Sequence, residues 1–397
     1  MPGDGLALDG IRMLDLTSQL SGPYCAMILA DLGADVIKVE RPGVGDDARQ
    51  APPKIKGESA PFMIYNRNKR GLTLDLKAPA GRKIALALAG RVDIVLENFR
   101  PGTVARLGLG DDDVRAVNPR VIYCSISGFG QTGPYRERGG FDRIAQGMSG
   151  VMSINGEEDG PPLPLPIPIS DIGTGMFAAI GILAALAARA RTGRGQRIDT
   201  SLLETPIAWS IYEAGSYFAT GEVPRRLGPG HRASAPYQAF RTKDSWINLG
   251  GGAPGFWPKI CALLGVPALV EDPRFRTPGD RVTHRRELEA LLQPHFERET
   301  TATWLDRLEA EGIPAGPILT YDQVFADPQV IHREMAVPVE HPVAGPTRVL
   351  GIPFKLSGTP AGIRRPAPTL GQHTEEILGE LGYDADAIRR LRSDRVI

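Results

Sequence analysis

Apolar and polar residues along the first 130 positions form patterns that predict strands and helices in turn. Short, almost wholly apolar runs such as IRMLDL (11–16) and ADVIKVE (34–40) indicate buried strands. Between them, SGPYCAMILADLG (21–33) has the length and spacing of a helix that ends at a glycine. The alternation continues with a helix at 81–91 and strands at 93–99 and 119–127. Such alternation favours βαβ units and a parallel sheet, so the expected fold class is α/β.

Ligands of parallel sheets bind beyond the carboxyl ends of the strands. No GxGxxG motif follows a predicted strand in this sequence, which disfavours a nicotinamide or flavin dehydrogenase. Basic residues occur near the relevant loops instead, namely Arg41, Lys69, Arg70, Lys77, Arg100 and Arg106. These residues suit a phosphorylated ligand such as a nucleotide or coenzyme A (CoA). The alternative is a solvated surface held together by ion pairs.

The pattern changes along the chain in a way that predicts two domains. Residues 1–205 form the expected large domain, and residues 318–397 are expected to return and complete it. Residues 221–317 form the expected small domain, with helical stretches around 257–264, 284–294 and 301–311.

Asp171 stands immediately before a long run of small apolar residues, Ile172 to Leu186, whose spacing suits a buried helix. Aspartate is a favoured N-cap because its side-chain oxygen accepts a hydrogen bond from a free backbone N–H of the first turn. From the residues alone, capping is the simplest explanation of this acid.

Composition narrows the choice of partners. Formal net charge is zero among 397 residues, so neither nucleic acid nor an anionic membrane surface is an expected partner. The longest apolar run, Met176–Ala188, is too short to span a bilayer. Three separated cysteines and six scattered histidines indicate no disulfide framework, metal site or prosthetic group. The first residues lack the pattern of a signal peptide, so the cytoplasm is the expected location.

A series of segments in a fixed order resembles one known family, the class III CoA-transferases. This family contains formyl-CoA, carnitine-CoA and succinyl-CoA-dependent transferases and the 2-methylacyl-CoA racemases. The matching segments are LDGIRMLDLTSQLSGP, LADLGADVIKVERPGVGDDAR, NRNKRGLTLDLK, DIVLENFRPGTVARLGL, NPRVIYCSISGFGQTGP, SDIGTGMFAAIGILAAL and RTGRGQRIDTSLLE, followed by APYQAF, GIPAGPI, DPQV and APTLGQHTEEIL.

The resemblance implies a homodimer of two interlocked chains, each with a Rossmann-like large domain and a smaller α+β domain. It places the active site between the large domain of one chain and the small domain of the other. The expected substrates are an acyl-CoA thioester and a carboxylic acid, and CoA is a substrate rather than a resident cofactor.

The resemblance also gives Asp171 a catalytic role, because it matches the family's nucleophile. Its carboxylate would attack the donor thioester to form a mixed anhydride, and the released CoA thiolate would attack the aspartyl carbonyl to form an aspartyl-CoA thioester. The acceptor acid then reverses the sequence. Gly173 and Gly175 are expected to leave room for this thioester. A cap and a nucleophile are compatible roles.

Contacts with CoA are implied for the positions that match the family's motifs. These are Gln19, Leu20, Ser21, Arg41, Leu74, Lys77, Asn98, Phe99, Arg100, Arg106, Arg138 and Phe141. For Leu74 and Phe99, packing in the core is an equal alternative.

The acyl half of the site is less specified, and no motif identifies the donor or the acceptor acid. Racemases of the family carry a histidine where this chain has Phe141, so a racemase is the alternative enzyme. Asp142 remains as a pocket carboxylate or a structural one. A non-catalytic CoA-binding protein is the alternative of another class, but it would have lost the nucleophile, and Asp171 is present.

Two further sets of residues are candidates from the small domain. Arg232 could bind the far carboxylate of a dicarboxylic acid, with His231 beside it, or it could be a surface residue. The glycines Gly250, Gly251 and Gly252 are expected either to form a loop that closes over intermediates or to form a turn at a strand end.

Overall fold

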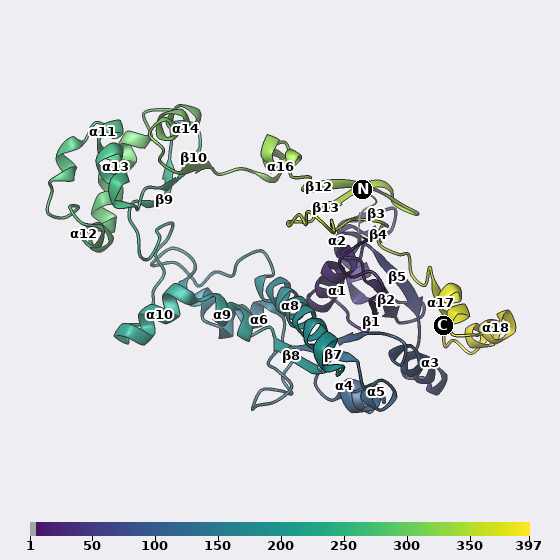
Figure 1. The fold of residues 1–397 in the computed structure, drawn as a ribbon. Helices are drawn as coiled ribbons and strands as arrows, with labels where there is room; N and C mark the ends of the chain where they lie inside the picture. The colour runs from purple at the N-terminus through teal and green to yellow at the C-terminus, as the bar shows by residue number, and fades with distance from the viewer. Residues whose placement is uncertain (1–4) are drawn as a thin grey trace. The chain divides into compact units, whose positions relative to one another are not determined.

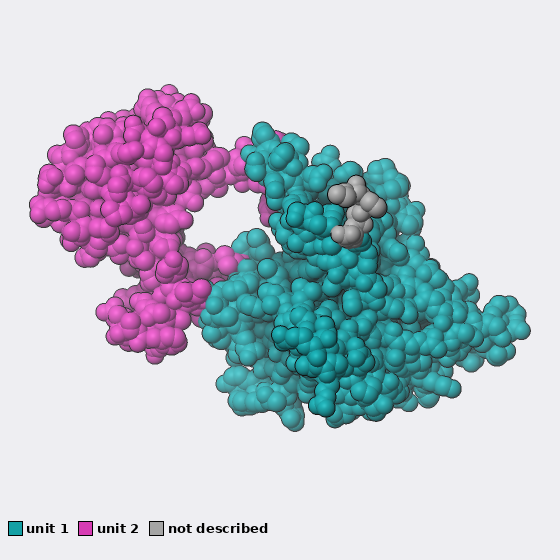
Figure 2. All heavy atoms as spheres, viewed as in Figure 1, with its two compact units in different colours: residues 1–149, 166–209, 327–397 teal, residues 150–165, 210–326 magenta. Residues whose placement is uncertain are grey.

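The structure is a computed structural model that describes residues 5–397. The chain divides into two compact units, which Figure 2 colours separately. Unit 1 comprises the residues up to Ser149, Pro166–Trp209 and Asp327–Ile397, and unit 2 comprises Gly150–Leu165 and Ser210–Ala326. The first four residues of the predicted 1–205 domain lie outside the described part of the chain.

A six-stranded parallel sheet is the centre of unit 1, which confirms the predicted α/β class (Figure 1). The strand order is β5-β2-β1-β6-β7-β8. The strands are β1 (Arg12–Asp15), β2 (Asp35–Glu40), β5 (Lys69–Thr73), β6 (Ile94–Glu97), β7 (Ile122–Ser127) and β8 (Arg197–Ser201). The order reverses between β1 and β6, and at such a switch point a crevice opens beyond the carboxyl ends of the strands.

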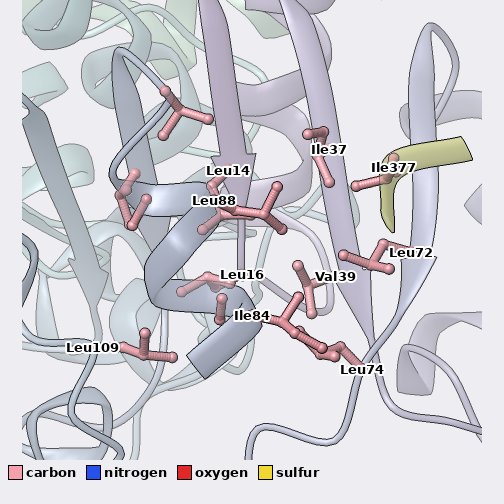
Figure 3. Packing of buried hydrophobic residues seen from close by; sticks show 14 of the residues in the cluster. Leu14, Leu16, Ile37, Val39, Leu72, Leu74, Ile84, Leu88, Leu109 and Ile377 are labelled. Atoms are coloured by element: carbon pink, nitrogen blue, oxygen red, sulfur yellow. The ribbon is translucent and has the colours of Figure 1, made fainter. Parts of the chain in front are cut away.

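Alternate residues of each strand enter two separate cores, as the period of a strand requires. Leu14 of β1 belongs to a core with α3 (Pro79–Ala89), whereas its neighbour Met13 packs on the opposite face with α1 (Ser21–Asp31). Figure 3 shows the first of these cores, where Ile84 and Leu88 of α3 pack over the strands. The sheet is therefore covered by helices on both faces, and both faces of its strands are apolar.

Helix α8 (Ile169–Thr192) packs closely on α1. A Cβ at Gly175 would lie 2.6 Å from the backbone oxygen of Ser21, so only a glycine permits this approach. The helix is longer than the run Met176–Ala188 and, within the described chain, is the one helix long and apolar enough to cross a membrane. Its buried face, which includes Ala178 and Ile182, forms part of the core beneath the sheet.

The remaining elements of unit 1 surround this sheet. They are η1 (Asp47–Gln50), β3 (Lys54–Ile55), β4 (Glu58–Ser59), α2 (Ala60–Tyr65), α4 (Thr103–Arg106), α5 (Asp111–Val117), α6 (Asp142–Met148), α9 (Glu204–Trp209), α16 (Pro328–His332), β12 (Ala336–His341), β13 (Gly345–Leu350), α17 (Thr374–Glu380) and α18 (Ala385–Ser393). The segment that contains α17 and α18 contacts the sheet through backbone and side-chain hydrogen bonds. Thr73 N–H donates to Thr374 Oγ1 at 3.1 Å, and Asp75 N–H donates to the Val396 carbonyl at 2.8 Å.

Unit 2 has its own core and a small antiparallel sheet of order β11-β10-β9. Its elements are α7 (Val151–Ile154), α10 (Ile211–Thr220), β9 (Tyr237–Arg241), β10 (Trp246–Gly250), η2 (Pro254–Phe256), α11 (Trp257–Leu264), η3 (Pro267–Val270), α12 (Pro278–Thr283), α13 (Arg285–Phe296), α14 (Thr301–Ala310), β11 (Ala315–Pro317) and α15 (Tyr321–Val324). The helices expected around 257–264, 284–294 and 301–311 correspond to α11, α13 and α14.

Unit 2 also contains residues 150–165 and 318–326, both of which were expected in the large domain. For residues 150–165, hydrogen bonds to backbone carbonyls explain this difference. The Gly228 N–H donates to the Gly156 carbonyl at 3.1 Å, and the Arg226 guanidinium donates to the Glu157 carbonyl at 3.0 Å. A hydrophobic pattern does not record such contacts between distant segments.

Candidate functional site

Two adjoining cavities lie at the carboxyl edge of the parallel sheet, both within unit 1. The large cavity has a volume of about 840 Å³, and residues 39–47, 74–77, Thr103, Arg392 and Arg395 are among its lining residues. The small cavity has a volume of about 270 Å³ and contains Asp171. Because Ser18, Asp47 and Phe99 line both, one elongated ligand can occupy the two together.

Most of the residues that the sequence implied for CoA line these cavities. Arg41, Leu74, Lys77 and Phe99 line the large cavity. Gln19, Ser21, Asn98, Phe99, Arg100, Arg138, Phe141 and Asp171 line the small one. Leu20 and Arg106 line neither of them, and Arg106 donates instead to the hydroxyl of Thr103 at 3.1 Å. Leu74 is also 1% exposed in the core, so it combines the two roles that were considered alternatives.

A buried polar network holds the loop between β1 and α1 in place at the junction of the cavities. Lys38 Nζ donates to the Thr17 carbonyl at 3.0 Å and to Asp46 Oδ2 at 2.9 Å. The other oxygen of Asp46 accepts the backbone N–H of Gln19 at 3.0 Å. Burial alone would raise the pKa of Asp46, but the charge of Lys38 and the backbone donors hold that pKa below its usual value.

The same loop contains a strained residue. Gln19 has a φ of 66°, in the left-handed region that residues with a Cβ rarely adopt. Its neighbour Ser18 is fixed by two hydrogen bonds with the Asn98 side chain, at 2.9 and 2.7 Å. These contacts hold Gln19 in an unfavourable conformation beside the small cavity, which is typical of functional loops.

Two of the basic residues considered for phosphate binding have structural roles instead. Lys69 is completely buried and pairs with Asp15 at 3.1 Å. Arg70 pairs with Asp35 at 2.6 Å and with two glutamates of α17. The expectation that they face a ligand is wrong, because these cations of β5 neutralise carboxylates on neighbouring strands and on α17.

Asp171 is not the N-cap of α8, so that expectation is wrong. The helix begins at Ile169 after Pro168, and Asp171 lies within its first turn. The cap comes from another element, because Asp142 at the start of α6 accepts the backbone N–H of Ser170 at 2.9 Å. Asp142 also accepts from the Gln146 amide at 2.8 Å, which fixes its carboxylate. The Asp171 side chain is thereby left available to the small cavity.

The environment of Asp171 disfavours its charge. Burial, and then the nearby charge of Asp142, raise its pKa to about 7. The position in the first turn of a helix acts in the opposite direction, since that end attracts anions. No hydrogen bond to the Asp171 carboxylate forms within the described chain. Its ionised form is therefore weakly solvated, which favours reactivity as a nucleophile.

The two glycines that follow Asp171 are required for packing and not for space at the site. A Cβ at Gly173 would lie 2.2 Å from the Trp209 ring and 2.5 Å from the Thr205 methyl group. Gly175 faces the backbone of α1 in the same way. The expectation that they leave room for a thioester is wrong, because both positions are already filled by neighbouring elements.

Sequence reasoning missed several residues of the site. Arg392 and Arg395 line the large cavity. In the sequence they lie more than 370 positions after Leu16, which lines the same cavity. Tyr65 at the end of α2 is partly buried, and burial, then the charges of Asp46 and Asp171, raise the pKa of this tyrosine. A basic run, RRLRSDR, was the one available signal for the arginines, and nothing in the sequence pointed to Tyr65.

The small-domain candidates all lie in unit 2. Arg232 pairs with Glu213 at 3.3 Å, and His231 stacks on Tyr237 at 4.9 Å between ring centroids. Gly250 is the last residue of β10, and Cβ atoms at Gly250, Gly251 and Gly252 would all meet neighbouring atoms within 3.1 Å. Close packing at a strand end accounts for these glycines without a moving loop.

No group of three or more metal-ligating side chains occurs in the part of the chain that the structure describes. The three cysteines are free thiols and are buried.

Comparisons with known proteins agree on one family. The model described as CoA-transferase family III matches residues 8–374. The chain is 43% identical over 392 residues to the succinyl-CoA:glutarate CoA-transferase of Mus musculus, covering 98% of this chain and 90% of that protein. It is 40% identical over 390 residues to the succinate–glutarate CoA-transferase of Agrobacterium fabrum, covering 96% and 97%. A crystal structure of a CAIB/BAIF family protein from Brucella suis matches with a TM-score of 0.85 at 38% identity, covering 95% and 100%.

The raised pKa of Asp171 predicts a pH-dependent effect of its removal on stability. Folding raises the pKa of the Asp171 carboxyl from 3.8 to about 7, so the folded state holds this proton more tightly than the unfolded state. The resulting stabilisation is fully present below pH 3.8 and is lost as pH rises through about 7. Asp171→Asn should therefore stabilise the protein more at pH 8 than at pH 5.5, by about 2 kcal/mol. Urea denaturation at the two pH values measures the difference. An equal effect at both would contradict the raised pKa.

Proposed function

This chain belongs to CoA-transferase family III, and from that premise we propose that it transfers CoA between dicarboxylic acids with Asp171 as the nucleophile. The observation that carries the proposal is the position of Asp171. It is a carboxylate that has no cationic partner among residues 5–397, and it lies in a small cavity that continues into a larger, cation-lined one. The other carboxylate of the small cavity, Asp47, is already paired with Arg41.

The two cavities account for the two ends of an acyl-CoA. The nucleotide lies in the large cavity, where Arg41 and Lys77 meet its phosphates. The pantetheine arm passes the shared residues Ser18 and Phe99, which brings the thioester into the small cavity. A cavity of about 840 Å³ is in the range of sites for ligands of this size.

The reaction proceeds through covalent intermediates on Asp171. Its carboxylate oxygen attacks the donor thioester carbonyl, and the C–S bond breaks to release CoA thiolate and a mixed anhydride. The thiolate then attacks the aspartyl carbonyl and expels the donor acid, leaving an aspartyl-CoA thioester. The acceptor carboxylate attacks this thioester, and CoA attacks the acceptor's carbonyl to regenerate Asp171. No proton is consumed, so the protein supplies position and charge.

Racemisation is not favoured by the same cavity. Phe141 is 69% exposed and lines the small cavity, where its phenyl ring offers no group that exchanges a proton. Asp142 is engaged as the cap of α8, which supports a structural role for this carboxylate.

The relatives from Mus musculus and Agrobacterium fabrum support succinyl-CoA as donor and glutarate as acceptor. A dicarboxylic acid has a second carboxylate that needs a cation, and Arg232 with His231 beside it is our candidate. Arg232→Ala should raise the KM for the acid much more than the KM for the acyl-CoA. An equal rise in both would contradict a role of Arg232 in specificity.

The proposed location of the protein is the cytoplasm. The proposed assembly is a homodimer with interlocked chains. Large apolar side chains are exposed in both units, among them Trp209 on α9 and Ile211, Tyr212 and Phe218 on α10. Such exposure is typical of surfaces that another chain covers. Light scattering should give twice the chain mass at all concentrations, and a monomer would contradict this proposal.

The transfer reaction itself provides the test of the proposed function. With succinyl-CoA and glutarate, the wild-type enzyme should form glutaryl-CoA, and hydroxylamine should trap a hydroxamate on the peptide that contains Asp171. Asp171→Asn should lose both the trapped product and essentially all transfer, because an amide is a poor nucleophile. Mass spectrometry identifies the product and the modified residue.

Asp47→Asn is the matched control, because it changes the other carboxylate of the small cavity. At saturating substrate it should still give the hydroxamate on Asp171. Substantial transfer by Asp171→Asn, once deamidation is excluded by mass, would refute the nucleophile. Exchange of α-protons with solvent in the absence of transfer would instead establish a racemase.

A further inference from the structure

We infer that Arg395 binds a phosphate of the CoA nucleotide, as a contact that the segment after α18 adds to the large cavity. The inference rests on the proposed function, since it takes CoA as the ligand of this cavity. Three observations support it, namely the backbone conformation of Arg395, the way its neighbours are anchored, and the pairing of the charges that line the cavity.

The backbone at Arg395 has a conformation that favours glycine. Helix α18 ends at Ser393, and Arg395 has a φ of 57°. The Val396 N–H donates to the Leu391 carbonyl at 2.9 Å, and the Arg395 N–H donates to the Arg392 carbonyl at 3.1 Å. These two bonds define a Schellman motif with Arg395 at its left-handed position, where glycine is the usual residue. An arginine there is less favourable than glycine, so local folding does not explain its presence.

The residue after Arg395 fixes its place at the rim of the cavity. Val396 is 5% exposed in the core that the sheet forms with α3, and its carbonyl accepts the Asp75 N–H at 2.8 Å. Asp75 and Lys77 belong to the loop after β5 that lines the same cavity. Arg395 is thus held beside this loop by a buried anchor, while its own side chain is exposed to the cavity.

Most charges around the large cavity neutralise one another. Glu40 pairs with Arg49, Asp46 with Lys38, Asp47 with Arg41, and Arg392 with Glu375. Lys77 and Arg395 are the lining cations that form no ion pair within the described chain. One lining side-chain carboxylate, Asp75, also forms no ion pair within the described chain, so the two unpaired side-chain cations outnumber one unpaired side-chain anion. The remaining positive charge attracts an anion, and the planar guanidinium suits a phosphate through paired N–H donors.

The experiment compares CoA with 3′-dephospho-CoA by isothermal titration. Arg395→Gly and Arg395→Asn remove the guanidinium while the new residue tolerates the left-handed backbone. Both variants should keep or raise the melting temperature, and both should bind CoA on the order of 10-fold more weakly than the wild type. The KM for acyl-CoA should rise by a similar factor, because Arg395 lines the cavity proposed for the nucleotide.

The dephospho ligand identifies the phosphate. If only CoA binding weakens, Arg395 binds the 3′-phosphate, and if both ligands weaken equally, it binds the diphosphate. Arg390→Ala is the matched control for net charge, since Arg390 is on α18, just before Arg395, but outside the cavity lining. This variant should bind CoA as the wild type does.

Unchanged CoA affinity in both Arg395 variants would overturn the inference, and so would an equal loss in Arg390→Ala. Failure of the wild-type protein to bind CoA at all is a different result, because it would refute the proposed function itself.

Discussion

The buried pair of Lys38 and Asp46 is the interaction on which the site depends. It joins β2 to the loop that follows this strand. Its two members also form hydrogen bonds with Thr17 and Gln19, which fix the loop between β1 and α1. Both side chains are almost inaccessible to water, so breaking the pair would leave an uncompensated charge inside the protein. Such pairs contribute little net stability but constrain geometry, and here the constrained element separates the two cavities.

A second feature of the site is the conflict between burial and charge at Asp171. Two carboxylates lie near the start of α8, and they have different roles because their partners differ. Asp142 accepts hydrogen bonds from Ser170 and Gln146, whereas Asp171 faces the small cavity and has a raised pKa. The packing of Gly175 against α1 then fixes the position of Asp171 relative to Ser21, the first residue of α1.

The sequence predicted the regular part of the fold because strand and helix periods are local properties. The runs 11–16 and 34–40 contain β1 and β2, and their order along the chain implied a parallel sheet. The start of α8 was misjudged because its cap, Asp142, lies 28 positions before Ser170. Lys69 was misjudged because its partner Asp15 is 54 positions away. Arg395 was missed for the same reason, since only the fold brings it to the cavity.

The central claim is that Asp171 becomes covalently bound to the acyl group in each transfer, and isotope transfer tests it most directly. When the acceptor acid contains oxygen-18 in its carboxylates, one labelled oxygen must remain on Asp171 after the acceptor anhydride is cleaved by CoA. Digestion and fragmentation by mass spectrometry should therefore locate oxygen-18 on the Asp171 side chain and on no other residue. Complete turnover with an unlabelled Asp171 would contradict the account.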